Sequence, residues 1–402
     1  MVIMGDSFTF PEGQAATNRV ATYAKGLMEH GITVNVIVMM CVYKEQHTGV
    51  SDGIPYFHSF EHKQRSGSFF VRRWRIFKKY LHTYSLLRKL NRQEKIVAIN
   101  VWTTLFHTHM FCWLMARVLG AKLVRECSEH PLREHQGGFI NRRIGVIKTK
   151  IETRFCDGIL CISKYLINFF KENGVKDEKL FLLPSTVDPT RFSIRGEKPL
   201  NSPYIGYFGS LTFFRDSIDV LIRAFARFNP GHPSVKLVLG GFFSSEEQEK
   251  KTRNLIQELN IAQNVMILDY LDRQEVLKYI VHADVLVMAR SKDLESSASY
   301  PSKLTEYLST GVPVVSVKVG EITEYMEDHV NSYLVEAGDD VAMADRLSQI
   351  FMDYPRAIEV GKKGKALTAG VFNYNVQAKR MIGFINSLYK KAQPQWRPIN
   401  YP

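Results

Sequence analysis

Cysteine is scarce in this chain of 402 residues, and its few copies form no recognisable pattern. The five cysteines are Cys41, Cys112, Cys127, Cys156 and Cys161. Their number is odd, no two are spaced as C-x-x-C, and all lie in apolar stretches, so a disulfide framework is excluded as the basis of the fold. We expect reduced thiols that pack in a core.

Metal-ligand patterns are missing as well. The 12 histidines show no H-E-x-x-H or related spacing, which is the kind of arrangement that a catalytic zinc site needs. We therefore expect neither a metal site nor a cofactor.

Long hydrophobic runs are also lacking. The chain opens with Met1-Val2-Ile3-Met4-Gly5, without the basic segment and apolar run of a signal peptide. The best candidate for a membrane span, residues 103–124, is interrupted by two histidines, an arginine and a lysine. It predicts a helix followed by a strand, and we expect a cytoplasmic protein.

Acidic residues are few in the first half of the chain. Up to Arg195 there are 29 lysines and arginines but 16 acids, whereas the remainder has 24 of each. A surface biased in this way attracts polyanions such as acidic lipid, lipid phosphates or nucleic acid. Because no helix-turn-helix, zinc or RNP signature is present, we do not expect nucleic acid as a partner.

Buried strands and helices alternate along the whole chain, which predicts parallel sheets covered on both faces. Strand-like apolar runs occupy residues 34–42, 96–101, 122–125, 158–162 and 180–183, and again 204–208, 235–239, 265–268, 285–288 and 313–317. Between the two series, residues 195–203 read as a polar linker. The sequence therefore predicts an α/β protein of two doubly wound domains, 1–195 and 196–372, with a helix and tail at 373–402.

Ligands bind at the carboxyl ends of the strands in such sheets, and two segments of the second half lie there. Gly209 and Arg215 follow a predicted strand, so the backbone can approach a ligand and a guanidinium can meet a phosphate. Further on, Pro301 opens a helix whose first amides, at residues 302–304, form an anion site backed by the helix dipole. Glu306 lies one turn deeper, where a carboxylate can hold two hydroxyls.

These segments resemble the retaining, metal-independent glycosyltransferases of family 4 (group 1), which have the GT-B fold. The matching pieces are Gly209-Ser-Leu with Arg215, His282-Ala-Asp-Val-Leu-Val-Met, Pro301-Ser-Lys-Leu-Thr-Glu306-Tyr-Leu with Gly311-Val-Pro-Val, and Leu183-Pro-Ser-Thr-Val-Asp188 with Phe192. The resemblance implies two Rossmann-like domains that face each other across a cleft, with acceptor bound by the first and donor by the second. It implies a nucleotide-sugar donor, its diphosphate bound by Arg215 and the amides of Ser302, Lys303 and Leu304, and its ribose by Glu306.

Two positions depart from the family pattern. Ala298 stands where the first glutamate of Glu-x7-Glu is usual, and Ser210 replaces a phosphate-binding arginine. Contacts to the transferred sugar are affected, and Glu295 is a candidate substitute.

Two loops of the first half complete the expected site. By the resemblance, Gly13 and Gln14 lie beside the donor diphosphate and the acceptor. The loop after residues 122–125 resembles the family loop that touches the transferred sugar near the reacting carbon, and its Glu129 and His130 are our catalytic candidates. The alternative is that both are loop residues held by local hydrogen bonds.

Residues 62–93 contain no acidic residue, and their aromatic and basic residues recur at helical spacing. The apolar face comprises Phe70, Trp74, Phe77, Leu81 and Tyr84. Arg72, Arg75 and Lys79 lie mostly off that face and are our candidates for contact with a membrane or acceptor, each cation near an anionic leaflet contributing about 1 kcal/mol. The alternative is that the aromatics pack on the domain core.

Taken together, these features predict transfer of a hexosyl group from a UDP- or GDP-sugar to a glycan or lipid-linked acceptor, in cell-surface polysaccharide or glycolipid synthesis. We expect a cytoplasmic protein at the inner face of an anionic membrane. The alternatives are a GT-B-like sugar-nucleotide epimerase, or a non-catalytic binding member of the fold, which Ala298 and Ser210 would favour. A phosphorylase would need a pyridoxal-phosphate lysine, and none is identified.

Overall fold

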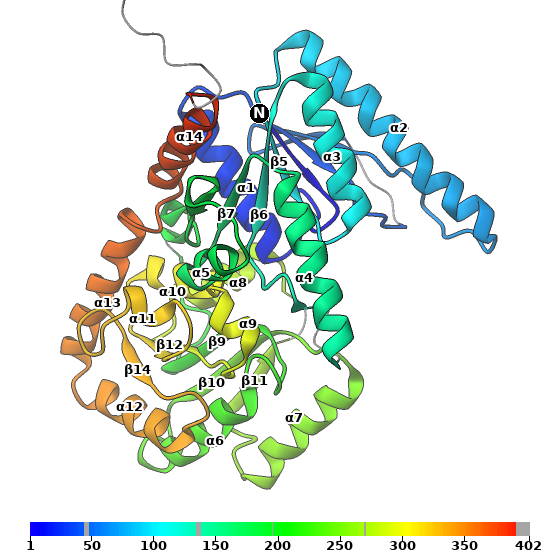
Figure 1. The fold of residues 1–402 in the computed structure, drawn as a ribbon. Coiled ribbons are helices and arrows are strands. Elements are labelled where there is room, and N and C mark those ends of the chain that lie inside the picture. Colours follow the sequence, from blue (N-terminus) through cyan, green and yellow to red (C-terminus); the bar gives the residue numbers. More distant parts are fainter. Residues whose placement is uncertain (44–47, 134–137, 195, 269–270, 391–402) are drawn as a thin grey trace, which may run out of the picture. The chain divides into compact units, whose positions relative to one another are not determined.

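The computed structural model describes residues 1–402 except 44–47, 134–137, 195, 269–270 and 391–402 (Figure 1). The chain forms two compact units, Met1–Pro184 with Tyr374–Pro402, and Ser185–Asn373. Each unit has its own parallel sheet and its own apolar core.

The first unit is built on an eight-stranded sheet in the order β3-β4-β2-β1-β5-β6-β7-β8. Its strands are β1 Val2–Gly5, β2 Asn35–Val38, β3 Gly49–Ser51, β4 Ile54–His58, β5 Ala98–Trp102, β6 Lys122–Cys127, β7 Gly158–Cys161 and β8 Leu180–Leu182. Only the β3–β4 pair is antiparallel. Strands β1, β5 and β7 are buried along their whole length, as expected where helices cover both faces of a sheet.

Helices cover this sheet on both faces. They are α1 Ala15–Glu29, α2 Phe69–Gln93, α3 Phe106–Leu119, α4 Gly138–Arg154, α5 Lys164–Glu172 and α14 Tyr374–Lys390. The predicted helix and strand within residues 103–124 are confirmed as α3 and β6. Among the described residues, none of the helices combines the length and the apolar content that a membrane crossing requires.

The last helix packs on the first unit. A Cβ at Gly26 of α1 would lie 2.7 Å from both the Cβ of Ala378 and the carbonyl oxygen of Tyr374, so the two helices need a glycine there to approach this closely. The Tyr374 hydroxyl donates to Glu29 Oε1 at 2.6 Å. Met381 and Phe384 of α14 join the core formed by α1, β1 and β2. The tail expected after α14 lies outside the described residues.

The second unit has a six-stranded, wholly parallel sheet in the order β11-β10-β9-β12-β13-β14. The strands are β9 Tyr204–Ser210, β10 Lys236–Phe242, β11 Val265–Leu268, β12 Val285–Met288, β13 Val314–Val317 and β14 Tyr333–Val335. The helices are α6 Ile218–Phe228, α7 Glu246–Glu258, α8 Arg273–Val281, α9 Leu294–Ala298, α10 Ser302–Thr310, α11 Ile322–Tyr325, α12 Asp340–Met352 and α13 Tyr354–Ala369.

The units divide at Pro184/Ser185, earlier than the predicted boundary at 195/196. Residues after Pro184 belong to the second unit because Val187 pairs with Asn373 and its amide donates to the Phe372 carbonyl at 2.9 Å. Phe192, at the end of a short 3-10 turn Pro189–Phe192, is buried. The turn residues after Leu183 therefore mark the boundary, and the polar stretch after 195 does not.

Candidate functional site

The strand order of the second unit defines the edge at which a ligand would bind. Winding reverses between β9 and β12, and in open parallel sheets such a reversal leaves a crevice at the carboxyl ends of the strands. The loops after these two strands meet there, since the Ser291 amide donates to the Arg215 carbonyl at 3.2 Å. The amino end of α10 reaches the same edge through contacts between its side chains and β9.

Two glycines let the backbones at this edge come close. Gly209 on β9 pairs in register with Gly241 on β10, and both have positive φ angles, +154° and +148°. A Cβ at Gly241 would lie 1.7 Å from the Gly209 carbonyl oxygen, and one at Gly209 would lie 2.4 Å from Lys303 Nζ. Only glycine fits either position.

Lys303 is held beneath the end of β9. Its Nζ donates to Asp216 Oδ1 at 2.9 Å and to the Tyr207 hydroxyl. Burial lowers the pKa of Lys303, against the opposing effect of Asp216. Burial works to raise the pKa of Asp216, but the Lys303 ammonium and its hydrogen bonds bring it below the usual value. The pair fixes the loop after β9 to α10, so the lysine side chain is structural here.

The amino end of α10 presents free amides at this edge. Pro301 is the N-cap, with Ser302 the first helical residue. The Leu304 amide donates to the Pro301 carbonyl at 3.0 Å, so of the three amides predicted to bind an anion, those of Ser302 and Lys303 remain. They lie at the positive end of the helix dipole.

Glu306 is half-buried one turn into α10, on the same side as Ser302 because four residues separate them. The next residue, Tyr307, is fully buried; its hydroxyl accepts from the Phe208 amide at 2.7 Å and donates to the Phe208 carbonyl at 3.1 Å. These two bonds fix the rotation of α10 against β9. The carboxylate of Glu306 is thereby placed by a rigid helix and not by a loop.

Arg215 and Glu295 lie close together, with Nη1 of Arg215 3.9 Å from Oε2 of Glu295. Glu295 belongs to α9, and Ala298 at the end of that helix is fully buried, so a carboxylate at 298 would have no water. Ser210 is half-buried, and its carbonyl accepts from the Tyr207 hydroxyl at 2.9 Å. The structure thus places Arg215 and Glu295 at one edge with the end of β9.

Arg290, which follows Ala289 just after the end of β12, is not among the residues that the sequence predicted for the site. It is 6% exposed and donates from Nε to Ser296 Oγ at 2.9 Å and from Nη2 to Ser299 Oγ at 2.8 Å. Burial lowers its pKa, and Arg215 adds to that effect. Its position as the first charged residue after a switch-point strand was a signal that could have identified it.

In the first unit, Gly13 and Gln14 lead into α1 and are both exposed. A Cβ at Gly13 would lie 2.1 Å from Thr17 Oγ1 and 2.3 Å from Thr9 Oγ1, so only glycine fits between the two threonines. Gln14 is the N-cap of α1 and makes no side-chain capping bond. The loop follows β1, whose neighbours β2 and β5 make it the switch point of this sheet.

The two catalytic candidates, Glu129 and His130, differ in how far they are buried. Glu129 is partly exposed and forms an ion pair with Arg133. His130 is buried, its ring 4.7 Å from that of Phe169, and burial lowers its pKa to about 4. Its Nδ1 accepts from the Leu132 amide at 3.1 Å, so the neutral ring carries its hydrogen on Nε2 and can only donate from there.

The long helix α2 exposes the apolar face that the sequence predicts. Phe70 is 82% exposed, and Trp74, Phe77 and Leu81 are about half exposed. The alternative of core packing is therefore wrong for these four side chains. The residues that α2 buries are Lys79, Thr83, Leu87 and Leu90, so nothing before Lys79 is buried.

The prediction of Lys79 as a membrane or acceptor contact is wrong. Its side chain is 3% exposed and its Nζ lies 3.5 Å from Cys41 Sγ, because it sits on the packed face of α2. Arg72 and Arg75 are half-buried, and Arg75 donates to the Gln64 carbonyl at 2.7 Å. The exposed cations beside the apolar face are instead Arg73, Lys78, Arg88 and Lys89.

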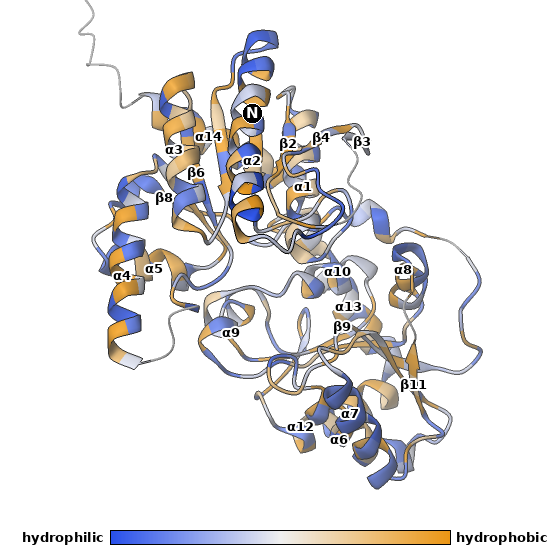
Figure 2. Ribbon diagram, turned by 90° about the vertical axis from the view of Figure 1, so that its right-hand side faces the viewer, coloured by the Kyte–Doolittle hydropathy of each residue, from blue (hydrophilic) through white to orange (hydrophobic). Residues whose placement is uncertain are grey.

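Helix α4 exposes a similar face. Orange segments alternate with blue along it in Figure 2, and its exposed apolar residues are Phe139, Ile140, Ile144 and Ile147. Its exposed charges are Arg142, Arg143, Lys150 and Arg154, while its one acid, Glu152, is buried against Arg125 at 2.8 Å. Both helices thus present apolar and basic side chains.

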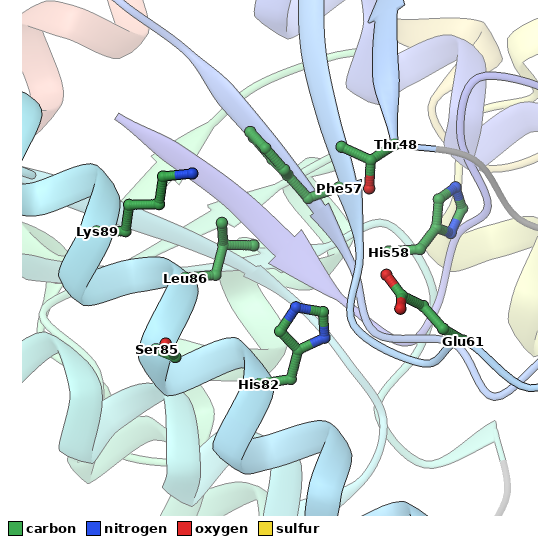
Figure 3. Close-up of a pocket in the computed structure, with 8 residues that line it drawn as sticks. All are labelled: Thr48, Phe57, His58, Glu61, His82, Ser85, Leu86 and Lys89. Atoms are coloured by element: carbon green, nitrogen blue, oxygen red, sulfur yellow. The ribbon is translucent and has the colours of Figure 1, made fainter.

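A cavity of about 290 Å³ lies between the end of β4 and α2 (Figure 3). His58 and Glu61 line one side, and His82 and Lys89 of α2 line the other. Its mixed polar lining suits a hydroxyl-rich ligand. In the part of the chain that the structure describes, no three histidine, cysteine or acidic side chains are grouped as metal ligands would be.

Comparison with known proteins gives two adjoining family matches. Residues 190–367 match the model of "Glycosyl transferases group 1", and residues 16–191 match that of "Glycosyltransferase Family 4". The two matches meet close to the division between the units.

Among individual relatives, a D-inositol 3-phosphate glycosyltransferase of Corynebacterium aurimucosum is 28% identical over 41% of this chain and 38% of its own length. The amylovoran biosynthesis glycosyltransferase AmsK of Erwinia amylovora is 21% identical over 54% of this chain and 52% of its own length. The chain thus matches only about half, or less, of these relatives.

Among solved structures, Anabaena Alr3699/HepE in complex with UDP and glucose superposes with a TM-score of 0.71 at 16% identity, covering 96% of this chain and 99% of that one. This likeness confirms the fold class predicted from the sequence. The chain belongs to the group 1 glycosyltransferases, with the GT-B fold of two Rossmann-like domains.

Proposed function

We propose that this chain transfers a hexosyl group from a nucleoside-diphosphate sugar, UDP- or GDP-linked, to a glycan or lipid-linked acceptor. The observation that carries the proposal is the switch point of the second unit, where the Ser302 and Lys303 amides, the Arg215 guanidinium and the Glu306 carboxylate lie at one edge. The solved neighbour that holds UDP and glucose supports a donor of this class.

Each group has a separate task in binding the donor. The amides and the helix dipole behind them stabilise the diphosphate. The planar guanidinium of Arg215 adds a positive charge and further hydrogen bonds to it. Glu306, one turn deeper, accepts from the two ribose hydroxyls. Glu295 lies 3.9 Å from Arg215 and is our candidate for contact with hydroxyls of the transferred sugar, in the role that Ala298 cannot fill.

The reaction we propose retains the configuration at the anomeric carbon. The bond from that carbon to the diphosphate oxygen breaks, and a bond to the acceptor oxygen forms on the same face. The departing diphosphate takes the acceptor proton. The cations and amides at the switch point stabilise the charge that develops on the leaving group, and His130, neutral at physiological pH, contributes a hydrogen-bond donor.

We also propose that the protein works at the cytoplasmic surface of an anionic membrane, where a lipid-linked acceptor is found. The exposed apolar residues of α2 and α4 and the cations beside them support this proposal. Interfacial helices combine apolar burial with attraction to acidic lipid. The cavity beside α2 would then accept a hydroxyl-rich part of the acceptor (Figure 3).

Ala298 and Ser210 favour a second candidate, a binding protein without turnover. Incubation with UDP-, GDP- and ADP-sugars, followed by detection of free nucleoside diphosphate, separates the two. Slow hydrolysis or transfer supports the transferase. Binding without any turnover, with and without membrane lipid extract as acceptor, would support the binding protein and overturn our proposal.

A further inference from the structure

We propose that Arg290 is a second cationic anchor for the donor diphosphate, acting beside Arg215 at the end of β12. This assignment rests on the proposed function, since it gives the ligand of the same site. It adds a residue that neither the sequence pattern nor the family matches identify.

The burial of Arg290 without an acidic partner carries the argument. Three arginines among the described residues are buried to the same extent, each 6% exposed: Arg19, Arg125 and Arg290. Arg19 lies 2.9 Å from Glu126, and Arg125 lies 2.8 Å from Glu152. Arg290 has two serine hydroxyls instead, its only hydrogen-bond partners among the described residues. A buried charge without an ionised partner is costly unless something else neutralises it.

The acidic groups nearest to Arg290 are already engaged. Asp216 accepts from Lys303 at 2.9 Å and from Thr212 at 3.0 Å. Asp293 accepts from the Ser296 amide and from the Ser291 hydroxyl, both at 2.7 Å. Neither lies within ion-pair distance of Arg290, although both attract it at longer range.

The cations around Arg290 repel one another. Arg215 lowers the pKa of Arg290, and both arginines act to lower the pKa of Lys303. A protein surface that gathers like charges in this way is stabilised by a bound anion. Nη1, the nitrogen of Arg290 that neither serine uses, is left to donate.

A diphosphate fits this arrangement better than a single phosphate. The amides of α10 and Arg215 bind one phosphoryl group, and the guanidinium of Arg290, held rigid by Ser296 and Ser299, binds the other. Arg290 is therefore expected to set the preference of the site for nucleoside diphosphates over monophosphates.

The test is calorimetric titration of the full chain with UDP, GDP and ADP and with the matching monophosphates. Arg290→Gln should weaken the preferred diphosphate roughly 10- to 100-fold and its monophosphate by much less. Arg290→Lys keeps the positive charge but loses the planar guanidinium, so its affinity for the diphosphate should lie between those of the unmodified chain and Arg290→Gln. Arg253→Gln, an exposed arginine of α7 paired with Glu249, is the control and should match the unmodified chain.

Ser299→Ala separates a direct contact from bracing of the loop, since it removes one hydrogen bond and keeps the guanidinium. Diphosphate affinity within about twofold of the unmodified chain supports the proposal, and a loss equal to that of Arg290→Gln overturns it.

If Arg290→Gln does not fold, Arg290→Lys decides: a reduced preference for diphosphate supports the contact, and an unchanged preference refutes it. If the unmodified chain shows turnover and Arg290→Gln binds the diphosphate as tightly as the unmodified chain, only this inference is refuted. If the unmodified chain binds no nucleotide, the proposed function is refuted as well.

Discussion

The two units share a parallel-sheet architecture but use their surfaces differently. The second unit holds ionised side chains in a connected network at its switch point: Lys303 with Asp216, Arg215 with Glu295, and Arg290 among serines. The first unit pairs its buried arginines with glutamates inside the fold and leaves apolar and basic side chains on α2 and α4. Our proposals accordingly assign a small charged ligand to the second unit and an extended surface to the first. The difference shows that a duplicated architecture leaves function to the residues placed at loop ends and on helix faces.

The first prediction tests what the units have in common. Gly5→Ala and Gly241→Ala put a Cβ 1.8 Å from the Trp102 carbonyl oxygen and 1.7 Å from the Gly209 carbonyl oxygen, each at the end of a strand next to the switch point. Each should lower the free energy of unfolding by roughly 3 kcal/mol or more, because backbone must move. Urea unfolding measures the loss. Gly231→Ala, where nothing lies within 4 Å, is the control, and an equal loss there would refute the explanation.

The second prediction separates the units by pH. Burial lowers the pKa of His109 to about 3 and that of His130 to about 4, so the unfolded first unit binds protons that the folded one does not. Its stability should fall as pH drops from about 6.5 to about 4 for His130 and to about 3 for His109, by as much as roughly 3 kcal/mol per histidine. The pKa of Asp216, depressed in the folded second unit, gives stability that is present above its unfolded pKa of about 3.8 and is lost only below it.

Thermal unfolding followed from pH 7 to pH 3 would reveal the two ranges. His130→Gln should flatten the dependence between pH 6.5 and 4 and leave the acid limb unchanged. Lys303→Met removes the ammonium that holds the pKa of Asp216 down, so the stability that Asp216 contributes above its unfolded pKa should be lost. A single titration shared by both variants would contradict the assignment of each range to its own unit.

The third prediction concerns the donor site. Glu306→Ala should weaken binding of the preferred nucleoside diphosphate about 10- to 100-fold, since two charge-assisted hydrogen bonds to the ribose are lost. Glu306→Gln should retain part of the affinity. Isothermal titration measures both, with Glu324→Ala on α11 as an exposed control. Unchanged affinity in Glu306→Ala would exclude this carboxylate from the site.

The smallest expected effect is on membrane binding. Phe70→Ser combined with Trp74→Ser should reduce flotation with vesicles containing anionic lipid several-fold, because two exposed aromatic side chains of α2 are lost. Met352→Ser, an equally exposed apolar position in the second unit, should have no effect. Binding that does not depend on anionic lipid, or that both variants reduce alike, would speak against a docking surface on the first unit.

Most of the strands along the chain and the amino end of α10 could be predicted from the sequence because they depend on local patterns: buried apolar runs, a proline before a helix, and a glycine after it. The packed face of α2 could not, since its apolar stripe faces outward and its first ten residues, Phe69 to Lys78, bury none of their side chains. Lys79 is buried with its Nζ close to Cys41, a contact between separate parts of the chain that helical periodicity does not encode.

The same limit applies at the site. The side chain of Lys303 bonds to Asp216 and Tyr207, which lie far from it in sequence. A local motif therefore predicts an anion-binding role for the Lys303 amide but cannot predict the structural role of its side chain. Arg290 could have been singled out by its place after a switch-point strand, but its lack of a carboxylate partner is a property that exists only after folding. The domain boundary was displaced because Val187 pairs with Asn373, a contact between the two ends of one unit.

That pairing also makes the second unit separable. Its first and last residues lie next to each other, joined by the bond from the Val187 amide to the Phe372 carbonyl, so residues 185–373 form a closed insertion within a host whose chain resumes at Tyr374. A polypeptide cut at these two points would lose no strand of its sheet. Recombination at two neighbouring positions would therefore be enough to exchange such a closed unit between hosts.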